Sequence, residues 1–393
     1  MKVVALAMAA AALLTVEQRD AHRSNLDYPT AAVSADGAFI AFTTYSQLAT
    51  ADIDRDSDLY VLDRIERRVM LETADVQGRV GNAAHPGISG DGRYVVFEGA
   101  DHIFLRDRSD RVTHLLATGR QPGISENGRF VVFAADMFER APGIDANGER
   151  SDIYAIDMRD MSARRVSVNL GKLDPSGAVS VSPSISRDGR YIAFTSKRKT
   201  MRGAIGDTYV FVYDAETNIT KLIGAGWDAA LSGDGRAVAF TAMSDGITHI
   251  SLADLQTGTT RVITRSVRRG LANGSSAKPR MSSDGRFVIF QSEASDLVAA
   301  EDFNLLWDVF IFDRENSTMT RVSGDADGAW MEPSTGPSID GRGSVVAFSS
   351  RHPTDASDKR NDFDLYVASL ATSSPQRRGV AENFILSSFF DFR

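Results

Sequence analysis

A short motif recurs along this chain, and its spacing restricts the fold more than any other feature. The clearest copy, PSISRDGRYIAFTS, occupies residues 183–196. Each copy has a glycine followed five residues later by a phenylalanine, and the chain holds only 21 phenylalanines in 393 residues. The seven pairs are Gly37 and Phe42, Gly92 and Phe97, Gly128 and Phe133, Gly189 and Phe194, Gly235 and Phe240, Gly285 and Phe290, and Gly343 and Phe348. Such regularity indicates an internal structural repeat.

The motif predicts a β-hairpin. Asp188 and Gly189 form a turn pair, because aspartate bonds its own backbone and glycine accepts positive φ. The apolar run at 191–194 is too short for a helix and rich in strand-forming residues. A second pair of strands follows, as at 58–64 and 68–73 in the first copy. Each repeat therefore supplies four strands.

Strand repeats with a period near fifty residues are typical of propeller blades. We predict an all-β fold, a seven-bladed β-propeller with four-stranded antiparallel blades, spanning residues 28–381. The seventh copy is altered, and keeps the spacing only if Asp340 replaces the motif serine and Arg342-Gly343 replaces Asp-Gly. Residues 377–381 supply a weak last strand.

The two ends of the chain lie outside the repeats. Residues 1–16 combine a positive start with an apolar run of 14 residues at 3–16, which predicts a signal peptide. A buried strand or a retained anchor is the alternative, since no A-x-A cleavage site ends the run. Residues 17–27 form a polar N-terminal segment. The phenylalanine-rich tail, 382–393, is expected to close or cover the ring, or to dock on a partner's sheet edge.

Bulk composition excludes several classes of protein. A net charge of -8 and a pI near 5.4 argue against nucleic acid as a partner, because no basic excess exists to displace counterions. No cysteine is present, which excludes disulfides, thiolate metal sites and a cysteine nucleophile. Beyond the leader no segment is long and apolar enough to be transmembrane.

The repeats resemble a known family. The pattern S-x-D-G-R, then an aliphatic run and Phe, then D-[LIV]-[YF]-[VAI] and R-V-S, is similar to the PD40 (WD40-like) repeat of the TolB-like β-propellers. MSSDGRFVIF at 281–290 with DVFIFD at 308–313 is among the closest copies. The resemblance implies a periplasmic or secreted propeller that serves as an interaction platform. The chain departs from TolB in having no room for an N-terminal α/β domain before the first repeat.

The repeated polar residues predict structure and no catalytic residue. Serine, aspartate and arginine recur in nearly every copy of the motif, whereas a catalytic set would occur once. We expect the serine to bond the turn backbone and the arginine to pair with a nearby carboxylate. The six histidines show no metal-binding spacing, and they are His22, His85, His102, His114, His249 and His352. His102 and His249 replace an aspartate that begins the third strand of other copies and is expected to satisfy loop amides.

One acidic loop predicts a metal site. Asp52, Asp54, Asp56 and Asp58 alternate in ADIDRDSD, the spacing with which a curled loop presents oxygen ligands to calcium. The glycine and terminal glutamate of an EF-hand are missing. A solvated acidic loop is the alternative, and no other cofactor is indicated.

Four long loops, at 43–57, 134–151, 291–307 and 349–363, join second and third strands and should gather on one face of the ring. They are the predicted binding surface for a protein or peptide partner in the cell envelope, with glycan as a further ligand. The competing hypotheses are a lyase or hydrolase acting on polysaccharide with carboxylates in the central opening, and a calcium-stabilised structural module.

Overall fold

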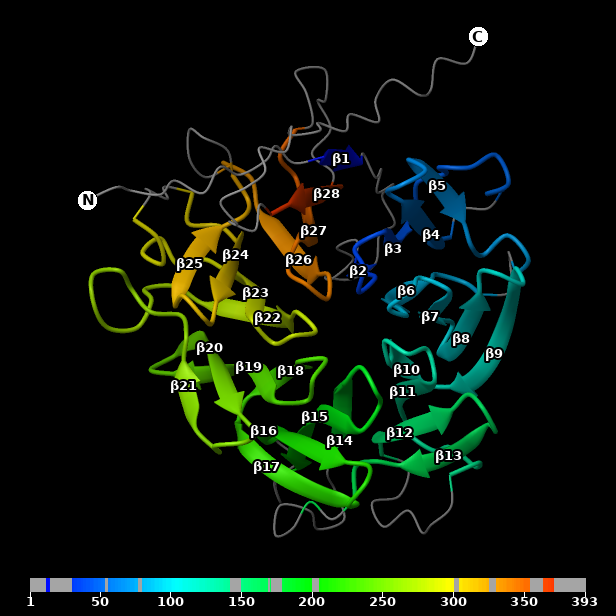
Figure 1. Cartoon of the computed structure of the whole chain (residues 1–393), viewed down its shortest axis with the longest axis horizontal. Coiled ribbons are helices and arrows are strands. Elements are labelled where there is room, and N and C mark those ends of the chain that lie inside the picture. The colour runs from blue at the N-terminus through cyan, green and yellow to red at the C-terminus, as the bar shows by residue number, and fades with distance from the viewer. Residues whose placement is uncertain are drawn as a thin grey trace.

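The computed structural model confirms the predicted propeller. It describes residues 12–14, 30–53, 56–76, 80–141, 150–168, 170, 179–199, 205–299, 304–324, 330–353 and 363–370. Within these ranges the chain forms strands and turns, and seven four-stranded antiparallel sheets surround one axis (Figure 1). The described part contains no helix that could cross a bilayer.

The strands follow chain order from the axis outward in six blades. Blade 1 holds β2 (Ala31–Val33), β3 (Phe39–Thr44), β4 (Asp58–Asp63) and β5 (Arg68–Leu71); blade 2 holds β6 (Ala84–Ile88), β7 (Tyr94–Gly99), β8 (His102–Asp107) and β9 (Val112–Thr118); blade 3 holds β10 (Arg120–Ile124), β11 (Phe130–Ala135), β12 (Asp152–Asp157) and β13 (Ser162–Arg165). Blade 4 holds β14 (Val179–Ile185), β15 (Tyr191–Lys199), β16 (Ile205–Asp214) and β17 (Ile219–Ala225); blade 5 holds β18 (Trp227–Leu231), β19 (Ala237–Ser244), β20 (Ile247–Asp254) and β21 (Thr260–Val262); blade 6 holds β22 (Ser276–Met281), β23 (Phe287–Ser292), β24 (Asp308–Asp313) and β25 (Thr318–Arg321).

Blade 7 draws on both ends of the chain. β26 (Ser334–Ile339), β27 (Val345–Ser350) and β28 (Asp364–Ser369) come from the last repeat, and β1 (Ala12–Leu14) pairs antiparallel with β28. The sequence assigned this outer place to residues 377–381, which lie outside the described residues, as does the tail 382–393. β1 falls inside the stretch predicted as a signal peptide.

The repeated glycine and phenylalanine have distinct tasks. All seven motif glycines have φ between 69° and 79°, the left-handed region that a hairpin turn requires. At Gly189 an added Cβ would lie 2.1 Å from the Phe130 ring of the preceding blade, so the turn also needs glycine for close packing. The seven motif phenylalanines are buried in the clusters between blades. The repeat thus builds the turn and the core together.

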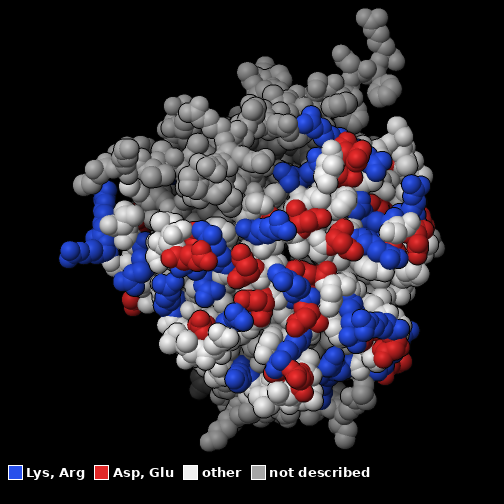
Figure 2. Space-filling model, in the orientation of Figure 1, with Lys and Arg blue, Asp and Glu red and all other residues white. Residues whose placement is uncertain are grey.

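The turns and loops that connect the strands lie on two opposite faces of the ring. The Asp-Gly turns and the turns between third and fourth strands lie on one face, which we call the Asp-Gly face. In blade 1 the two turns are joined there, because Arg64 N, just after β4, donates to Ala38 O, just after the Asp-Gly turn, at 2.9 Å. The described parts of the four long loops and of the connectors between blades lie on the opposite, long-loop face. There Ala83 N donates to Ser57 O at 2.6 Å. The view in Figure 2 shows basic and acidic side chains interspersed without a large patch of one sign.

The innermost strands carry a feature that the motif does not predict. In six of them the pairing shifts by a β-bulge, and one bulge residue has φ between 50° and 64°. Proline follows this residue in five of the six. The six residues, which we call the hub ring, are His85, Gln121, Ser182, Asp228, Lys278 and Gly336.

Candidate functional site

The polar residues of the Asp-Gly turns are occupied by structural bonds, as predicted. In blade 4, Ser186 Oγ donates to Asp188 Oδ1 at 2.7 Å and accepts from Tyr191 N at 2.9 Å. Arg190 binds both oxygens of Asp214 at 3.0 Å, and this hydrogen bonding lowers the pKa of Asp214 against the opposing effect of burial. The same pair forms between Arg93 and Asp107, Arg129 and Asp157, and Arg286 and Asp313.

The altered seventh turn also follows the prediction. Asp340 takes the place of the motif serine, and its carboxylate accepts from Ser344 N at 2.6 Å and from Val345 N at 2.9 Å. Gly343 has the left-handed φ of 70°. One carboxylate therefore does the work that a serine and an aspartate share in other blades.

The aspartates at the start of third strands accept a hydrogen bond from a hydroxyl that the sequence did not indicate. Ser323 Oγ donates to Asp308 Oδ1 at 2.6 Å and accepts from Val309 N at 2.8 Å, so the fourth strand is clamped to the third. Loop amides were predicted as partners; in blade 6 the loop amide Asn304 Nδ2 donates to Asp308 Oδ2 at 3.2 Å, and a hydroxyl fifteen residues downstream is a further partner. Equivalent clamps join Asp58 with Thr73, Asp152 with Ser167, and His249 with Thr264. These aspartates are structural.

The described histidines are scattered, as the sequence indicates. His102 begins the third strand of blade 2, whereas the third strand of blade 5 begins two residues before His249, at Ile247; in both blades a two-residue turn joins the second and third strands. Burial lowers the pKa of His249. His352 stacks on Trp330 with ring centroids 4.3 Å apart, and its Nδ1 lies 3.1 Å from Glu332. No three His, Asp or Glu side chains in the described ranges form a metal-binding group.

The aspartates predicted to bind calcium have different surroundings in the structure. Asp54 lies outside the described residues, and Asp58 belongs to a strand clamp. Asp52 is buried and accepts from Tyr60 Oη at 2.6 Å, while its other oxygen has no hydrogen-bond partner. Burial first, and then Asp52, raise the pKa of Tyr60. Asp58 likewise uses one oxygen in the clamp and has its other oxygen buried without a hydrogen-bond partner, so calcium binding stays a prediction.

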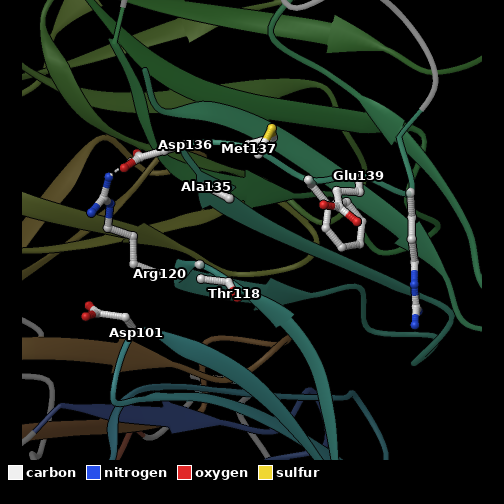
Figure 3. Close-up of a pocket in the computed structure, with 10 residues that line it drawn as sticks. Asp101, Thr118, Arg120, Ala135, Asp136, Met137 and Glu139 are labelled. Atoms are coloured by element: carbon white, nitrogen blue, oxygen red, sulfur yellow. Dashed lines mark hydrogen bonds and ion pairs between the residues drawn. The ribbon is translucent and has the colours of Figure 1, made fainter. Parts of the chain in front are cut away.

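A cleft of about 660 Å³ opens on the long-loop face between blades 2 and 3 (Figure 3). Its lining comes from the short turn of blade 2 and from the start of a longer loop in blade 3. Blade 2 turns from β7 to β8 through Ala100 and Asp101, both with positive φ, whereas β11 and β12 of blade 3 are separated by residues 136–151. We call this space the blade 2–3 cleft, and its lining is Asp101, Thr118, Gly119, Arg120, Ala135, Asp136, Met137, Phe138, Glu139 and Arg140.

The cleft wall combines an anchored aromatic residue with exposed polar and apolar groups. Phe138 packs edge-on against Phe133 at 5.2 Å and fixes the start of the blade 3 loop. Met137 beside it is 64% exposed. Figure 3 shows Arg120 and Asp136 facing each other, with an ion-pair distance of 2.6 Å. The wall can therefore offer both apolar contact and charged hydrogen bonds to a ligand.

A carboxylate lies between the cleft and the axis. Glu98 Oε2 accepts from Gln121 N at 2.8 Å and lies 3.1 Å from His85 Nδ1. Burial acts to raise the pKa of Glu98, but these bonds and the charge of Arg120 leave the pKa lowered. At this position, directly after the motif phenylalanine, Gln291 caps Gly336 N in the same way in blade 6. The bond from Gln121 N to Glu98 thus joins blade 3 to blade 2, and it also places a carboxylate beside the cleft.

The sequence did not single out this cleft. Its signal was the spacing of 36 residues between Gly92 and Gly128, which marks blade 2 as the most compact. The hub ring was missed for another reason, because its residues differ in every blade. The proline that follows most of them was the available signal.

Comparison with known proteins supports the fold. No family model matches the chain, and no curated protein does. Oligogalacturonate lyase from Vibrio parahaemolyticus is 12% identical, with 86% of this chain and 88% of that chain covered and a TM-score of 0.56. The β-propeller domain of the Trilobed protease from Pyrococcus furiosus is 11% identical, with 88% and 94% covered and a TM-score of 0.56.

TolB is also among the structural neighbours. TolB from Acinetobacter baumannii is 18% identical, with 75% of this chain and 66% of that chain covered and a TM-score of 0.46. At these identities a likeness speaks for the fold and not for an activity. The chain is a seven-bladed β-propeller, as its repeats predict.

Proposed function

We propose that this protein is a non-catalytic binding scaffold, periplasmic or secreted, that holds a segment of a protein or peptide partner in the blade 2–3 cleft. The observation that carries the proposal is the step between the two-residue turn of blade 2 and the long loop of blade 3. It makes a concave surface on a rigid frame. An envelope glycan is a further ligand class for the same face.

The chemistry of the cleft suits a peptide. Met137 offers a flexible apolar contact, and the Arg120–Asp136 pair offers donors and acceptors for backbone groups. Both members of the pair are about half exposed, so a ligand can reach them without a rearrangement of the core.

Photo-crosslinking tests the proposal directly. Benzoylphenylalanine replaces Met137 in one variant and Ile65 in a control, because Ile65 is 72% exposed and lies on the Asp-Gly face. Both variants are irradiated in envelope extract and the adducts are identified by mass spectrometry. A partner crosslinked from Met137 alone supports the cleft, and equal or absent crosslinking from the two positions contradicts it.

An enzyme acting on polysaccharide is the second candidate. It is favoured by the Glu98 carboxylate, which is held ionised beside His85 at the inner end of the cleft. A Glu98→Gln variant keeps the acceptor for Gln121 N and removes the charge. Turnover of an acidic or neutral polysaccharide by the wild type and its loss in E98Q would replace the scaffold proposal.

Export and closure of blade 7 can be tested together. Cleavage of the predicted signal peptide after residue 16 would remove β1, and blade 7 would keep β26, β27 and β28. N-terminal sequencing of the protein from its native compartment decides between the two arrangements. A mature chain that begins after residue 16 supports export, and an intact start supports the alternative of a retained strand.

A calcium-stabilised module is the third candidate. It predicts a rise in melting temperature with Ca²⁺ that is lost in Asp52→Asn, because the buried oxygen of Asp52 would then be a ligand. An unchanged melting temperature after chelator treatment would remove this candidate.

A further inference from the structure

One innermost-strand position breaks the pattern of the repeat. Two residues before the motif serine or its substitute, six blades carry a glycine, alanine or serine, and blade 6 carries an arginine. The seven residues are Ala32, Gly87, Gly123, Ser184, Ala230, Arg280 and Ser338. Blade 6 therefore has a long, positively charged side chain at a position where the other blades have a small residue or glycine.

The small residues are explained by the next blade. Ser184 Oγ accepts from Leu231 N of blade 5 at 3.0 Å, and Ser338 Oγ accepts from Val33 N of blade 1 at 3.2 Å. A Cβ at Gly87 would lie 3.7 Å from Ile124 N. The seam between innermost strands leaves no width for a guanidinium. The side chain of Arg280 must extend out of the seam toward the axis.

The accessibility of Arg280 agrees with this path. Its side chain is exposed to solvent, although protein surrounds it closely enough for burial to lower the pKa of the guanidinium. A side chain that projects into the water-accessible space enclosed by the innermost strands has this combination. Figure 1 shows these strands, from β2 to β26, arranged around the axis.

The charges around Arg280 do not balance. Lys278 lies two residues earlier on β22, and burial first, and then the charge of Arg280, lower the pKa of Lys278. Asp228 on β18 is the carboxylate that acts on both. Arg280 donates to Pro279 O at 2.8 Å, and no carboxylate of the described residues lies within ion-pair distance of it. Two cations on β22 thus share one carboxylate, so among the described groups that act on Arg280 positive charge is in excess.

We propose that Lys278 and Arg280 form an anion-binding site in the hub that takes a carboxylate group. A single negative charge balances the cluster, whereas a dianionic phosphate would leave an excess. The planar guanidinium can bind a carboxylate through two parallel hydrogen bonds. This site is separate from the blade 2–3 cleft and does not depend on the function proposed for the cleft.

Small probes test the site. N-acetylglycine carries one carboxylate, N-acetylglycinamide is its neutral counterpart, and methyl phosphate supplies the dianion. Ligand-observed saturation-transfer NMR on the full chain measures their binding. We expect saturable binding of N-acetylglycine, and weakening by about tenfold or more in Arg280→Met and Lys278→Met because a charge-assisted bond is lost. Glucuronate and an N-acetylglutamate amide then distinguish a sugar from a peptide as the source of the carboxylate.

The matched control removes a positive charge elsewhere. Arg261→Met lies on the outer strand β21, where Arg261 covers the Phe312 ring at 5.6 Å. It should bind N-acetylglycine as the wild type does, and Arg280→Lys should retain part of the affinity. Circular dichroism confirms that each variant is folded. Equal binding of the neutral amide, preference for methyl phosphate, or unchanged binding in both R280M and K278M would overturn the proposal.

Discussion

The seam between blades 2 and 3 opens on both faces of the ring, and the two openings differ. On the Asp-Gly face a cleft of about 290 Å³ is lined in part by Asn127, Gly128 and Arg129 of the repeated turn. Arg129 is held there by Asp157. On the long-loop face the cleft of about 660 Å³ is lined by residues outside the motif.

The two openings therefore differ in the kind of residue that lines them: recurring structural residues on one face, and residues specific to two blades on the other. Polar residues that recur in most blades are bonded to one another on the Asp-Gly face, which leaves them few free donors or acceptors. Residues that differ between blades line the blade 2–3 cleft and the hub. If this division holds, substitutions on the Asp-Gly face should cost stability, and those on the long-loop face should cost binding.

The largest loss of stability is expected from Gly189→Ala on the Asp-Gly face. Gly189 has φ of 79°, and an added Cβ would meet the Phe130 ring at 2.1 Å. Left-handed strain costs about 1 kcal/mol and displacement of the ring about 2 kcal/mol, so the free energy of unfolding should fall by about 3 kcal/mol. Urea unfolding followed by fluorescence measures it.

Gly246→Ala is the matched control on the long-loop face. Gly246 has φ of 81°, but nothing lies within 4 Å of an added Cβ. This variant should lose about 1 kcal/mol, from backbone strain alone. Equal losses in the two variants would show that packing of the repeated turn against the preceding blade adds nothing.

The second effect concerns the strand clamp of blade 6. In Ser323→Ala the buried Asp308 loses a donor and Val309 N loses its acceptor, which should cost about 2 kcal/mol. Thr318→Ala, at the exposed start of β25, should change the free energy of unfolding by less than about 0.5 kcal/mol. A loss in S323A no greater than in the control would mean that the clamp is not needed.

The repeat explains why most of the fold was predictable. Gly and Phe at one offset fix a turn and a core position in each blade, and Asp340 could be placed because it completes the same spacing. β1 could not be predicted as the outer strand of blade 7, because three apolar residues in a leader carry no register. Ends of fourth strands were also displaced, as at β25, where the chain leaves the ladder to form the Ser323 clamp.

The candidate sites were less accessible to sequence reasoning. A cleft between blades depends on the relative height of adjacent loops, which is a property of two repeats and not of one. The role of Arg280 follows from the width of the seam, and that width is set by the backbone of the neighbouring blade. Both sites lie where the repeat is broken, so an alignment of copies shows the position without showing its surroundings.

A smaller effect is expected when the Asp-Gly face is acidified. Burial acts to raise the pKa of Asp313, but bonds from Arg286 and Asn316 outweigh it and leave the pKa lowered. Unfolded aspartate titrates near pH 4, so the stabilisation is complete above about pH 4 and is lost as the pH falls through the lower folded value. Melting temperatures between about pH 6 and pH 2 should decline less steeply in Arg286→Met. The free energy of unfolding contributed by the pair should be less than about 1 kcal/mol, because Arg286 is one-third exposed and solvent screens the pair.

The smallest change in stability is expected from Arg120→Ala in the blade 2–3 cleft. Arg120 and Asp136 are both about half exposed, and exposed pairs contribute little, so the free energy of unfolding should change by less than about 0.5 kcal/mol. Crosslinking of a partner from position 137 should nevertheless fall, because the ligand loses a charged donor. A variant that is less stable but crosslinks normally would show that the pair braces the blade 3 loop. The contrast between a face built for stability and a face built for binding would then not extend to this cleft.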